Sequence, residues 1–262
     1  MTYLGFLFRF VFIPILILSG LTCWDLRQQA GLPRLQEKLI WRVIIIHIGL
    51  ALVYTTPWDN YLVASGVWFY NPRLVTGVVI GWVPLEEYTF FVVETLLSGL
   101  WWVFLARRLP DAGVFRPSRA GRLVGFGFLF VIWLLCIGLF FSGWKPGTYL
   151  SITLCWALPA IFPQFLFGAD ILWHQRWLVF WAIVPMSLYL SLADMAALKA
   201  TTWSISADQT IGMRFLGILP LEEIVFFFVT NTLIAFGMTL MLSNTSQQRL
   251  ADWRARSFRG LP

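Results

Sequence analysis

The octapeptide Pro-Leu-Glu-Glu-Tyr-Thr-Phe-Phe at residues 84–91 returns as Pro-Leu-Glu-Glu-Ile-Val-Phe-Phe at residues 220–227. Each copy opens an apolar run that is long enough, at about 20 residues, to cross a bilayer as a helix. A charged carboxyl group at the centre of such a helix costs about 2.5–3.5 kcal/mol. Because the chain carries the same costly pair of glutamates twice, the pattern indicates one site built from two halves.

The composition is typical of a membrane protein. Of the 262 residues, 59% are hydrophobic and 12% are charged, whereas a soluble domain carries about 25% charged residues. The cysteines Cys23, Cys136 and Cys155 lie in apolar runs without the spacing of metal ligands, and His47 and His174 are far apart. We therefore predict no metal site.

Seven apolar runs can cross a membrane as helices. They lie at residues 3–23, 39–56, 84–106, 121–141, 148–168, 176–198 and 219–242. No strand is predicted, and no Gly-x-Gly-x-x-Gly motif for a dinucleotide is present. The predicted fold class is an all-α membrane protein with seven transmembrane helices.

The basic residues orient these helices. Most of the 19 lysines and arginines, including Arg34, fall in the loops on one side of the predicted spans and in the C-terminal tail. The positive-inside rule makes that side cytoplasmic, with the C-terminus inside and the N-terminus outside. We predict a multi-pass protein of the cytoplasmic (inner) membrane. Its net charge of +6 then serves topology and contact with anionic lipid, and it requires no nucleic-acid partner.

The repetition extends beyond the octapeptide. Asp59 precedes Trp68 by nine residues, and Asp194 precedes Trp203 by nine. Two further aligned pairs are Glu94 with Thr230 and Thr95 with Asn231. Self-similarity over this length indicates an internal duplication.

The duplication divides the chain into four parts. We expect a first repeat at residues 1–112, a linker with the fourth helix at 113–145, a second repeat at 146–245 and a basic cytoplasmic tail at 246–262. The linker helix gives the two three-helix repeats the same orientation. Parallel repeats bring both glutamate pairs to the outer side of the membrane, whereas transporters commonly use inverted repeats.

Helix geometry separates the two glutamates of each pair, because adjacent residues point about 100° apart. Two matching stripes result: Glu87, Phe91 and Glu94, and Glu223, Phe227 and Thr230, with Asn231 beside the second. We expect these stripes to face the bundle interior and each other. Glu86 and Glu222 lie toward the adjacent face, where a second partner could hold them.

Two aspartates lie near the repeated phrases. Asp59 and Asp194 stand in the outer segments just before the two helices, where they could close the site from above or serve as ordinary caps.

The glutamates could also be capping signals, because a proline at the first turn followed by acids suits the positive end of a helix. A second copy that enters a membrane favours a functional role.

These residue types suit proton transfer to a hydrocarbon. A carboxyl group beside phenylalanines loses hydration, which favours its protonated form and lets it act as an acid. Aromatic faces stabilise a passing cation. An acid, a base and an aromatic lining in a dry site suit carbocation chemistry. The same groups could instead bind a proton or a cation for transport.

The doubled phrase resembles the integral-membrane lycopene cyclase domain. The residues that carry the resemblance are 84–91, 220–227, Thr230-Asn231 and Thr56-Pro57-Trp58-Asp59. This family occurs as two small subunits in some bacteria, as one fused chain in archaea and other bacteria, and joined to phytoene synthase in fungi. The resemblance covers residues 1–106 and 145–245 without a phytoene synthase portion, so the chain looks like the fused, stand-alone form.

The resemblance implies an intramolecular lyase (isomerase) of carotenoid biosynthesis. Such an enzyme converts the linear ψ-end groups of lycopene to β-ionone rings, giving γ-carotene or β-carotene, and it uses no cofactor. The implied partners are the linear carotenoid, membrane lipid and other enzymes of the carotenoid pathway. The residues leave open a β or an ε ring, a C40 or a C50 substrate, one or two rings, and the oligomeric state.

The resemblance also assigns roles to the repeated residues. Glu87 and Glu223 are expected to be acid and base, in either order, and Glu86 and Glu222 complete the expected catalytic set. The expected supporting residues are Asp59, Asp194, Glu94, Thr230 and Asn231. The expected substrate-lining residues are Tyr88, Phe90, Phe91, Phe226 and Phe227.

Other functions fit parts of the pattern. A hydratase of carotenoid end groups, or a cyclase of C50 carotenoids, could use the same residues. A proton- or cation-coupled transporter fits the buried acids, but the predicted parallel repeats argue against it. A retinal-binding photoreceptor needs a lysine in the last span, and the lysines are Lys38, Lys145 and Lys199.

Overall fold

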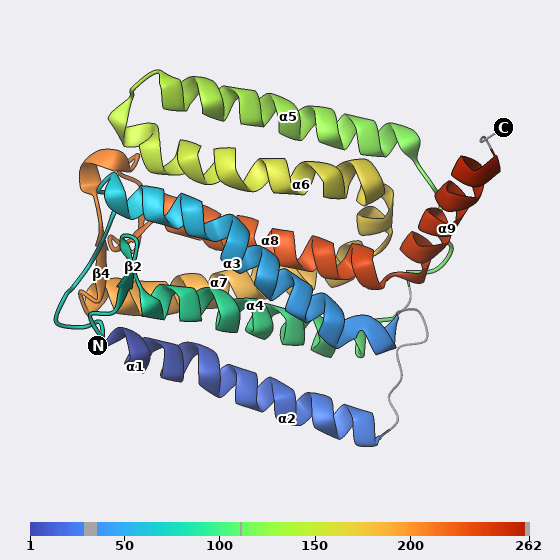
Figure 1. The fold of residues 1–262 in the computed structure, drawn as a ribbon, viewed down its shortest axis with the longest axis horizontal. Helices are drawn as coiled ribbons and strands as arrows, with labels where there is room; N and C mark the ends of the chain where they lie inside the picture. Colours follow the sequence, from blue (N-terminus) through green and yellow to red (C-terminus); the bar gives the residue numbers. More distant parts are fainter. Residues whose placement is uncertain (29–35, 111, 260–262) are drawn as a thin grey trace.

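The protein is a bundle of long helices that run side by side (Figure 1). The computed structural model describes residues 1–28, 36–110 and 112–259, with side chains as far as residue 255. Arg34, which was counted among the cytoplasmic basic residues, lies outside the described residues. The N-terminus and the C-terminal helix lie at opposite ends of the bundle (Figure 1).

Seven helical segments of the described chain are long and apolar enough to cross a membrane, which confirms the predicted number. The first combines α1 (Tyr3–Leu7), the π-helical turn η1 (Phe8–Phe12) and α2 (Ile13–Arg27). The others are α3 (Ile40–Ala64), α4 (Leu85–Ala106), α5 (Arg119–Phe141), α6 (Thr148–His174), α7 (Arg176–Lys199) and α8 (Leu221–Leu242). The shorter elements are η2 (Glu37–Leu39), η3 (Lys145–Gly147), η4 (Ala207–Gln209) and the C-terminal helix α9 (Asn244–Arg259).

The second predicted span ends too early. It was placed at residues 39–56, but α3 continues past Pro57 to Ala64. A proline inside a helix removes one N–H and crowds the preceding turn. Here the carbonyl of Tyr54, in that preceding turn, accepts a hydrogen bond from the indole of Trp156 on α6 at 3.3 Å. The N–H that Pro57 lacks would have bonded the carbonyl of Val53, so the Trp156 contact lies one residue from the freed carbonyl and joins the proline-containing turn to α6.

The expectation that the chain has no strands is wrong. Three short antiparallel pairs lie outside the helices: β1 (Trp68–Tyr70) with β4 (Trp203–Ile205), β2 (Val79–Ile80) with β3 (Val83–Pro84), and β5 (Arg214–Phe215) with β6 (Leu219–Pro220). Runs of two or three residues are too short for hydrophobic periodicity to reveal. The β2–β3 turn requires a glycine at Gly81, where φ is +67° and an added Cβ would lie 2.2 Å from the Asn60 side chain.

The helices differ in how deeply they are buried. In α4, 67% of the most apolar window is buried inside the protein, whereas in α5 that share is 0%. The helix α5 packs on α6 at the outside of the bundle (Figure 1). The helix α4 contacts α2, α3, α7 and α8. The fourth span is therefore peripheral, and the third is central.

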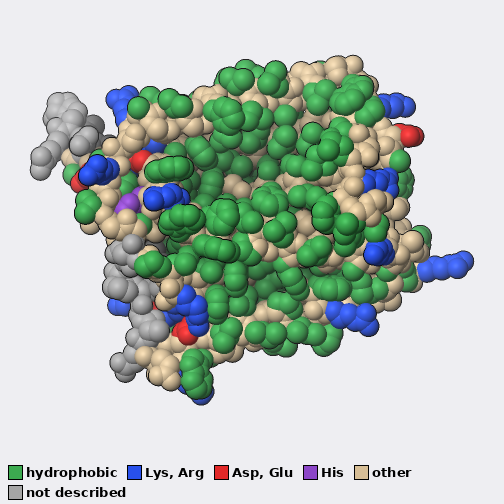
Figure 2. Space-filling view, turned by 180° about the vertical axis from the view of Figure 1, so that it is seen from behind, with side chains coloured by type: hydrophobic (Ala, Val, Ile, Leu, Met, Phe, Trp, Pro, Cys, Tyr) green, Lys and Arg blue, Asp and Glu red, His purple; other side chains and the backbone are tan. Residues whose placement is uncertain are grey.

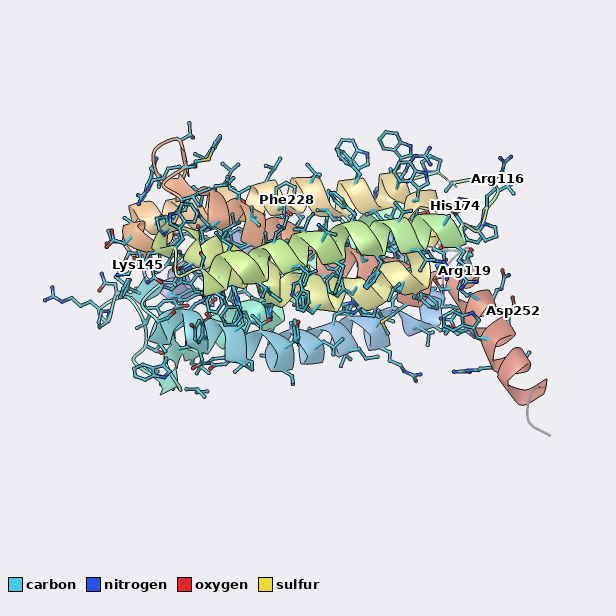
Figure 3. All side chains as sticks on the ribbon, turned by 90° about the horizontal axis from the view of Figure 1, so that it is seen from above. Arg116, Arg119, Lys145, His174, Phe228 and Asp252 are labelled. Atoms are coloured by element: carbon cyan, nitrogen blue, oxygen red, sulfur yellow. The ribbon has the colours of Figure 1, made fainter. Side chains whose placement is uncertain are left out.

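The surface has an apolar band between two charged ends. Figure 2 shows hydrophobic side chains across the middle of one face, with lysines and arginines near both ends. Figure 3 places Lys145 at one end of the bundle, and Arg116, Arg119 and Asp252 at the other. Such a band is the surface expected of helices that lie in a bilayer.

Candidate active site

Two helices bring the glutamate pairs to the same end of the bundle. The helices α4 and α8 both begin at the end that carries the N-terminus and the short strands (Figure 1). Pro84 and Pro220 are extended N-cap residues, so each helix starts one residue later than the proline, and both glutamates fall in its first turn. The four glutamate side chains, Glu86, Glu87, Glu222 and Glu223, are all buried.

The first glutamate of each pair holds a loop. Glu86 accepts a hydrogen bond from the backbone N–H of Thr76 at 2.5 Å. Glu222 accepts one from the backbone N–H of Ile211 at 2.7 Å. Because both contacts are to backbone groups of the preceding loop, these two carboxyl groups position chain segments.

The second glutamate of the first pair is bound by two phenols. The hydroxyl of Tyr3, at the start of α1, donates to Oε2 of Glu87. The hydroxyl of Tyr70, on β1, donates to the same oxygen at 2.9 Å. Burial raises the pKa of Tyr70 well above its ordinary value, and the nearby carboxyl groups of Glu87 and Asp59 raise it further. The Tyr70 phenol therefore stays protonated and remains a donor.

The second glutamate of the other pair is bound by an indole and a phenol. The indole N–H of Trp68 donates to Oε1 of Glu223 at 3.1 Å, and the Tyr149 hydroxyl donates to the same oxygen at 2.8 Å. Side chains two residues apart on a strand share a face. On β1, Trp68 therefore reaches Glu223 while Tyr70 reaches Glu87, so one three-residue strand connects the two glutamates.

The two aspartates lie inside helices, not in outer segments before them. Asp59 belongs to α3 and Asp194 to α7, and both are buried. For Asp59 the error arose because a proline and a polar stretch hid the end of α3, whereas Asp194 already fell within the span predicted at residues 176–198. Oδ1 of Asp194 accepts a hydrogen bond from the Trp203 indole at 2.8 Å, whereas its Oδ2 and both oxygens of Asp59 have no hydrogen-bond partner in the described protein.

Three of these carboxyl groups line one small cavity. Its volume is about 30 Å³, and Glu87, Asp194 and Glu223 form its polar part. The remaining lining is aromatic: Tyr3, Phe6, Trp68, Tyr70, Phe90, Trp203, Phe226 and Phe227. A single water needs about 10–15 Å³, so a hydrocarbon end group can enter only if aromatic side chains move.

A second, larger cavity adjoins the first. Its volume is about 500 Å³, and it shares Phe90, Phe226 and Phe227 with the small cavity. Phe91, Glu94 and Thr230 also line it. Phe91, Glu94, Phe227 and Thr230 belong to the two predicted stripes. Phe90 and Phe226 are the residues just before Phe91 and Phe227. The helices α4 and α8 therefore face a common interior.

Two predicted residues, Asn231 and Tyr88, line neither of these two cavities. The Ser98 hydroxyl donates to Asn231 at 2.8 Å and lies 3.2 Å from Glu94, so these three form a buried polar group between α4 and α8. Tyr88, which was expected to line the substrate pocket, lines neither of the two cavities. It follows Glu87 and therefore points around the helix to the β2 loop, where its hydroxyl donates to the carbonyl of Ile80 at 2.9 Å.

Sequence reasoning missed the side chains that bind the carboxyl groups. These are Tyr3, Tyr70, Tyr149, Trp68 and Trp203. A signal was present, since Trp68 and Trp203 hold matching positions of the repeat, and a tyrosine is the first residue of the first apolar run and the second residue of the fifth. Nothing local in the sequence says which carboxyl group each of them meets.

By its fold and this site, the chain is a helical protein with seven helices long and apolar enough to cross a membrane and an internal cluster of carboxyl groups suited to acid–base chemistry. It belongs to the lycopene cyclase family, whose model matches residues 1–109 and 146–246. It is 39% identical over 196 residues to the lycopene beta-cyclase of Halobacterium salinarum, a match that covers 74% of this chain and 80% of that protein.

Fungal relatives match over a smaller share of their own length. The bifunctional lycopene cyclase/phytoene synthase of Podospora anserina is 33% identical over 211 residues, which is 76% of this chain and 35% of that protein. The corresponding protein of Blakeslea trispora is 30% identical over 242 residues, which is 90% of this chain and 38% of that protein. No solved structure gives a significant match.

Proposed function

We propose that this chain is a lycopene cyclase that converts the linear ψ-end groups of lycopene to β-ionone rings. The observation that carries the proposal is the single cavity in which Glu87, Asp194 and Glu223 meet among aromatic rings. Membership of the family and the names of the curated relatives support the same reaction.

The reaction adds one proton and removes one. A protonated carboxyl group gives its proton to the terminal double bond, which leaves a tertiary cation. The electron pair of the neighbouring double bond forms the carbon–carbon bond that closes the ring, and the positive charge moves into the ring. A carboxylate then takes a ring proton, and the electrons of that C–H bond form the new double bond. Atoms and electrons balance, so the proposal requires no redox cofactor.

Glu87 and Glu223 are our candidates for the acid and the base. Each is bound by uncharged donors, the phenols and indole described above, and neither forms an ion pair among the described residues. A proton can therefore be gained or lost without breaking a salt bridge. Asp194 lines the same cavity with one oxygen unpartnered, so we place it as the residue that supports the proton exchange.

The aromatic lining would protect the cation. The ring centroids of Phe226 lie 5.1 Å from Phe227 and 5.8 Å from Trp68. Aromatic faces attract a cation without forming a bond to it. The same rings exclude water, which would otherwise capture the cation as an alcohol.

In this proposal the other predicted residues hold loops, support the carboxyl groups or lie along the substrate. Glu86 and Glu222, which were expected in the catalytic set, hold the loops at Thr76 and Ile211, and we place them as positioning residues. Asp59 supports the cluster from α3. Glu94 and Thr230 lie deeper, along the interior that the rest of the substrate would occupy. Asn231 is hydrogen-bonded to Ser98 beside Glu94.

The topology is also part of the proposal. We propose two parallel three-helix repeats at residues 1–112 and 146–245, joined by the linker at 113–145, with the tail at 246–262 and the N-terminus outside the cytoplasmic membrane. Support comes from the matched loop contacts of Glu86 and Glu222. The antiparallel pairing of β1 with β4 adds further support, since it joins the loops of the two halves. Contact of the basic end with anionic lipid follows from this orientation.

Expression in a host that accumulates lycopene tests the function. We expect β-carotene, with γ-carotene as its one-ringed precursor, when the extracted pigments are separated by chromatography. Unchanged lycopene in cells whose membranes contain the protein would contradict the proposal. A hydroxylated end group would instead identify a hydratase, because water would then have captured the cation.

A further inference from the structure

The large cavity has its outer wall between α3 and α6. Leu50 and Ala51 of α3, and Ala160 and Pro163 of α6, line it. Leu50 is 58% exposed, and Pro163 is also exposed. Because residues on both helices face the cavity and the outer surface at once, the cavity opens sideways between α3 and α6.

One cluster joins these two helices. Within the described residues, α3 and α6 exchange two hydrogen bonds, from the Tyr54 hydroxyl to the Trp156 carbonyl at 2.7 Å and from the Trp156 indole to the Tyr54 carbonyl at 3.3 Å. The Trp156 ring lies between those of Tyr54 and Trp58, with centroid distances of 5.7 and 4.5 Å and interplanar angles of 25° and 20°. We call Tyr54, Trp58 and Trp156 the aromatic clasp.

The clasp connects the surface to the carboxyl groups. Tyr54 is 40% exposed and lines the large cavity together with Trp156. Trp58 stacks on Phe226 at 5.4 Å and 10°, and Phe226 lines both cavities. A series of nearly parallel rings therefore runs from the exposed side of the opening to the boundary of the small cavity.

We propose that the polyene chain of the carotenoid lies in the large cavity, and that it enters from the lipid through the opening between α3 and α6. This inference rests on the proposed function. The lining is mostly apolar, which suits a ligand that carries no polar group, and the cavity leads past Phe90, Phe226 and Phe227 to the three carboxyl groups. A linear carotenoid dissolved in the membrane can slide in end first, and the clasp marks the point at which its end group passes from the chain cavity to the carboxyl groups.

The small side chains at the opening provide the test, because larger ones would fill the cavity. The parent is the full chain with Glu87→Gln and Glu223→Gln, isolated in detergent from cells that accumulate lycopene. Bound lycopene is measured by its absorbance per mole of protein. Adding Ala51→Trp or Ala160→Trp should reduce it about tenfold or more, the factor that about 1.4 kcal/mol of lost affinity produces.

The matched control is Val53→Trp, which adds the same ring to an α3 position that is 77% exposed and outside the cavity. We expect it to carry as much lycopene as the parent. A graded series, Ala160→Val, Ala160→Leu and Ala160→Trp, guards against misfolding, with helicity and thermal unfolding measured for each. A folded Leu or Trp variant that binds as much lycopene as the parent overturns the proposal, and so does a parent without bound lycopene.

Three further outcomes distinguish the proposed binding site from the proposed reaction. If bound phospholipid falls in the filled variants while lycopene does not, the cavity holds an acyl chain and the proposal is overturned. Ala160→Trp in the otherwise unsubstituted chain should also slow ring formation. If ring formation continues at the full rate, the chain site is refuted and the proposed function stands. If the unsubstituted chain forms no rings but lycopene binding still depends on Ala160, the chemistry is refuted and the site stands.

Discussion

Buried carboxyl groups occur at both ends of the bundle, and the two ends hold them with different partners. At the end that carries α9, the buried Asp25 and Asp170 pair with Arg108 and Arg249, each at 2.8 Å. The partly exposed Glu37 pairs with Arg107 there at 2.7 Å. At the opposite end, Glu87 and Glu223 are bound by phenols and an indole, and no ion pair to them occurs among the described residues.

The arginine end is built to stay charged. Arg249 of α9 binds both oxygens of Asp170, at 2.9 and 2.8 Å, and the backbone N–H of Ser118 donates to the same carboxylate at 3.0 Å. Asp170 lies two residues after Gly168, where the backbone of α6 leaves the helical conformation. An arginine remains protonated and binds a carboxylate in two places, so this contact fixes α9 and the end of α5 against α6.

The phenol and indole end is built so that protons can move. A phenol or an indole orients a carboxyl group through a hydrogen bond, but neither neutralises a full negative charge. Each carboxyl group there can therefore exist with or without its proton while its neighbours stay in place. The difference between the two ends separates carboxyl groups that support the fold from those we assign to chemistry. The following experiments test that separation.

We expect the largest effect on the rate of ring formation from replacing one of the two glutamates that we assign as acid and base. Glu87→Gln or Glu223→Gln keeps the shape of the side chain but cannot exchange a proton. We expect ring formation in lycopene-accumulating cells to fall by about 10²–10⁴-fold, the range for loss of a general acid or base. Glu37→Gln, at the arginine end, should leave the rate unchanged. Full activity in either site variant would remove that residue from its proposed role.

The next effect is on stability at the arginine end. Asp170→Asn leaves Arg249, whose side chain is 11% exposed, without its anion. Breaking a buried pair costs about 3–5 kcal/mol. The measurement is thermal or denaturant unfolding in detergent. The control is Asp252→Asn on the exposed side of α9, which should change stability by less than about 0.5 kcal/mol. If Asp170→Asn unfolds like the unsubstituted protein, the arginine contact does not fix α9.

A smaller effect is expected from removing one uncharged donor. Tyr149→Phe deletes the 2.8 Å hydrogen bond to Glu223, and a hydrogen bond to a charged group is worth about 1.5–3 kcal/mol. We expect ring formation to slow by about 10- to 150-fold, because each 1.36 kcal/mol changes a rate about tenfold, with protein levels in the membrane maintained. Tyr61→Phe, at a position on α3 that is 49% exposed, removes the same hydroxyl as a control. Equal rates for the two variants would mean that Tyr149 does not position Glu223.

The smallest effect concerns alkaline pH. Burial and the nearby carboxyl groups raise the pKa of Tyr70 above its ordinary value of 10.0 in the folded protein. Its contribution to stability is therefore complete below pH 10.0 and is lost as the pH rises toward the raised value. We expect the thermal midpoint of the unsubstituted protein to fall more steeply above pH 10.0 than that of Tyr70→Phe. Parallel curves would contradict the buried, protonated phenol.

The sequence determined those features that depend on local pattern. Hydropathy over about 20 residues predicted seven helices, and the doubled Pro-Leu-Glu-Glu phrase singled out the glutamates. The 3.6-residue period separated Glu87 and Glu223, which face the interior, from Glu86 and Glu222, which hold loops. Composition and the positive-inside rule supplied the proposed orientation. All of these follow from residues within a few turns of one another.

The tertiary structure alone decided which distant side chains meet. The donors to Glu87 and Glu223 come from as far as 84 and 155 residues away, and no local period encodes such a pairing. The strand that connects the two glutamates is three residues long, which is below what periodicity detects. Figure 1 shows α3 and α6 diverging away from the end that carries the short strands. A space between two helices depends on how they pack, and the sequence of neither helix contains it.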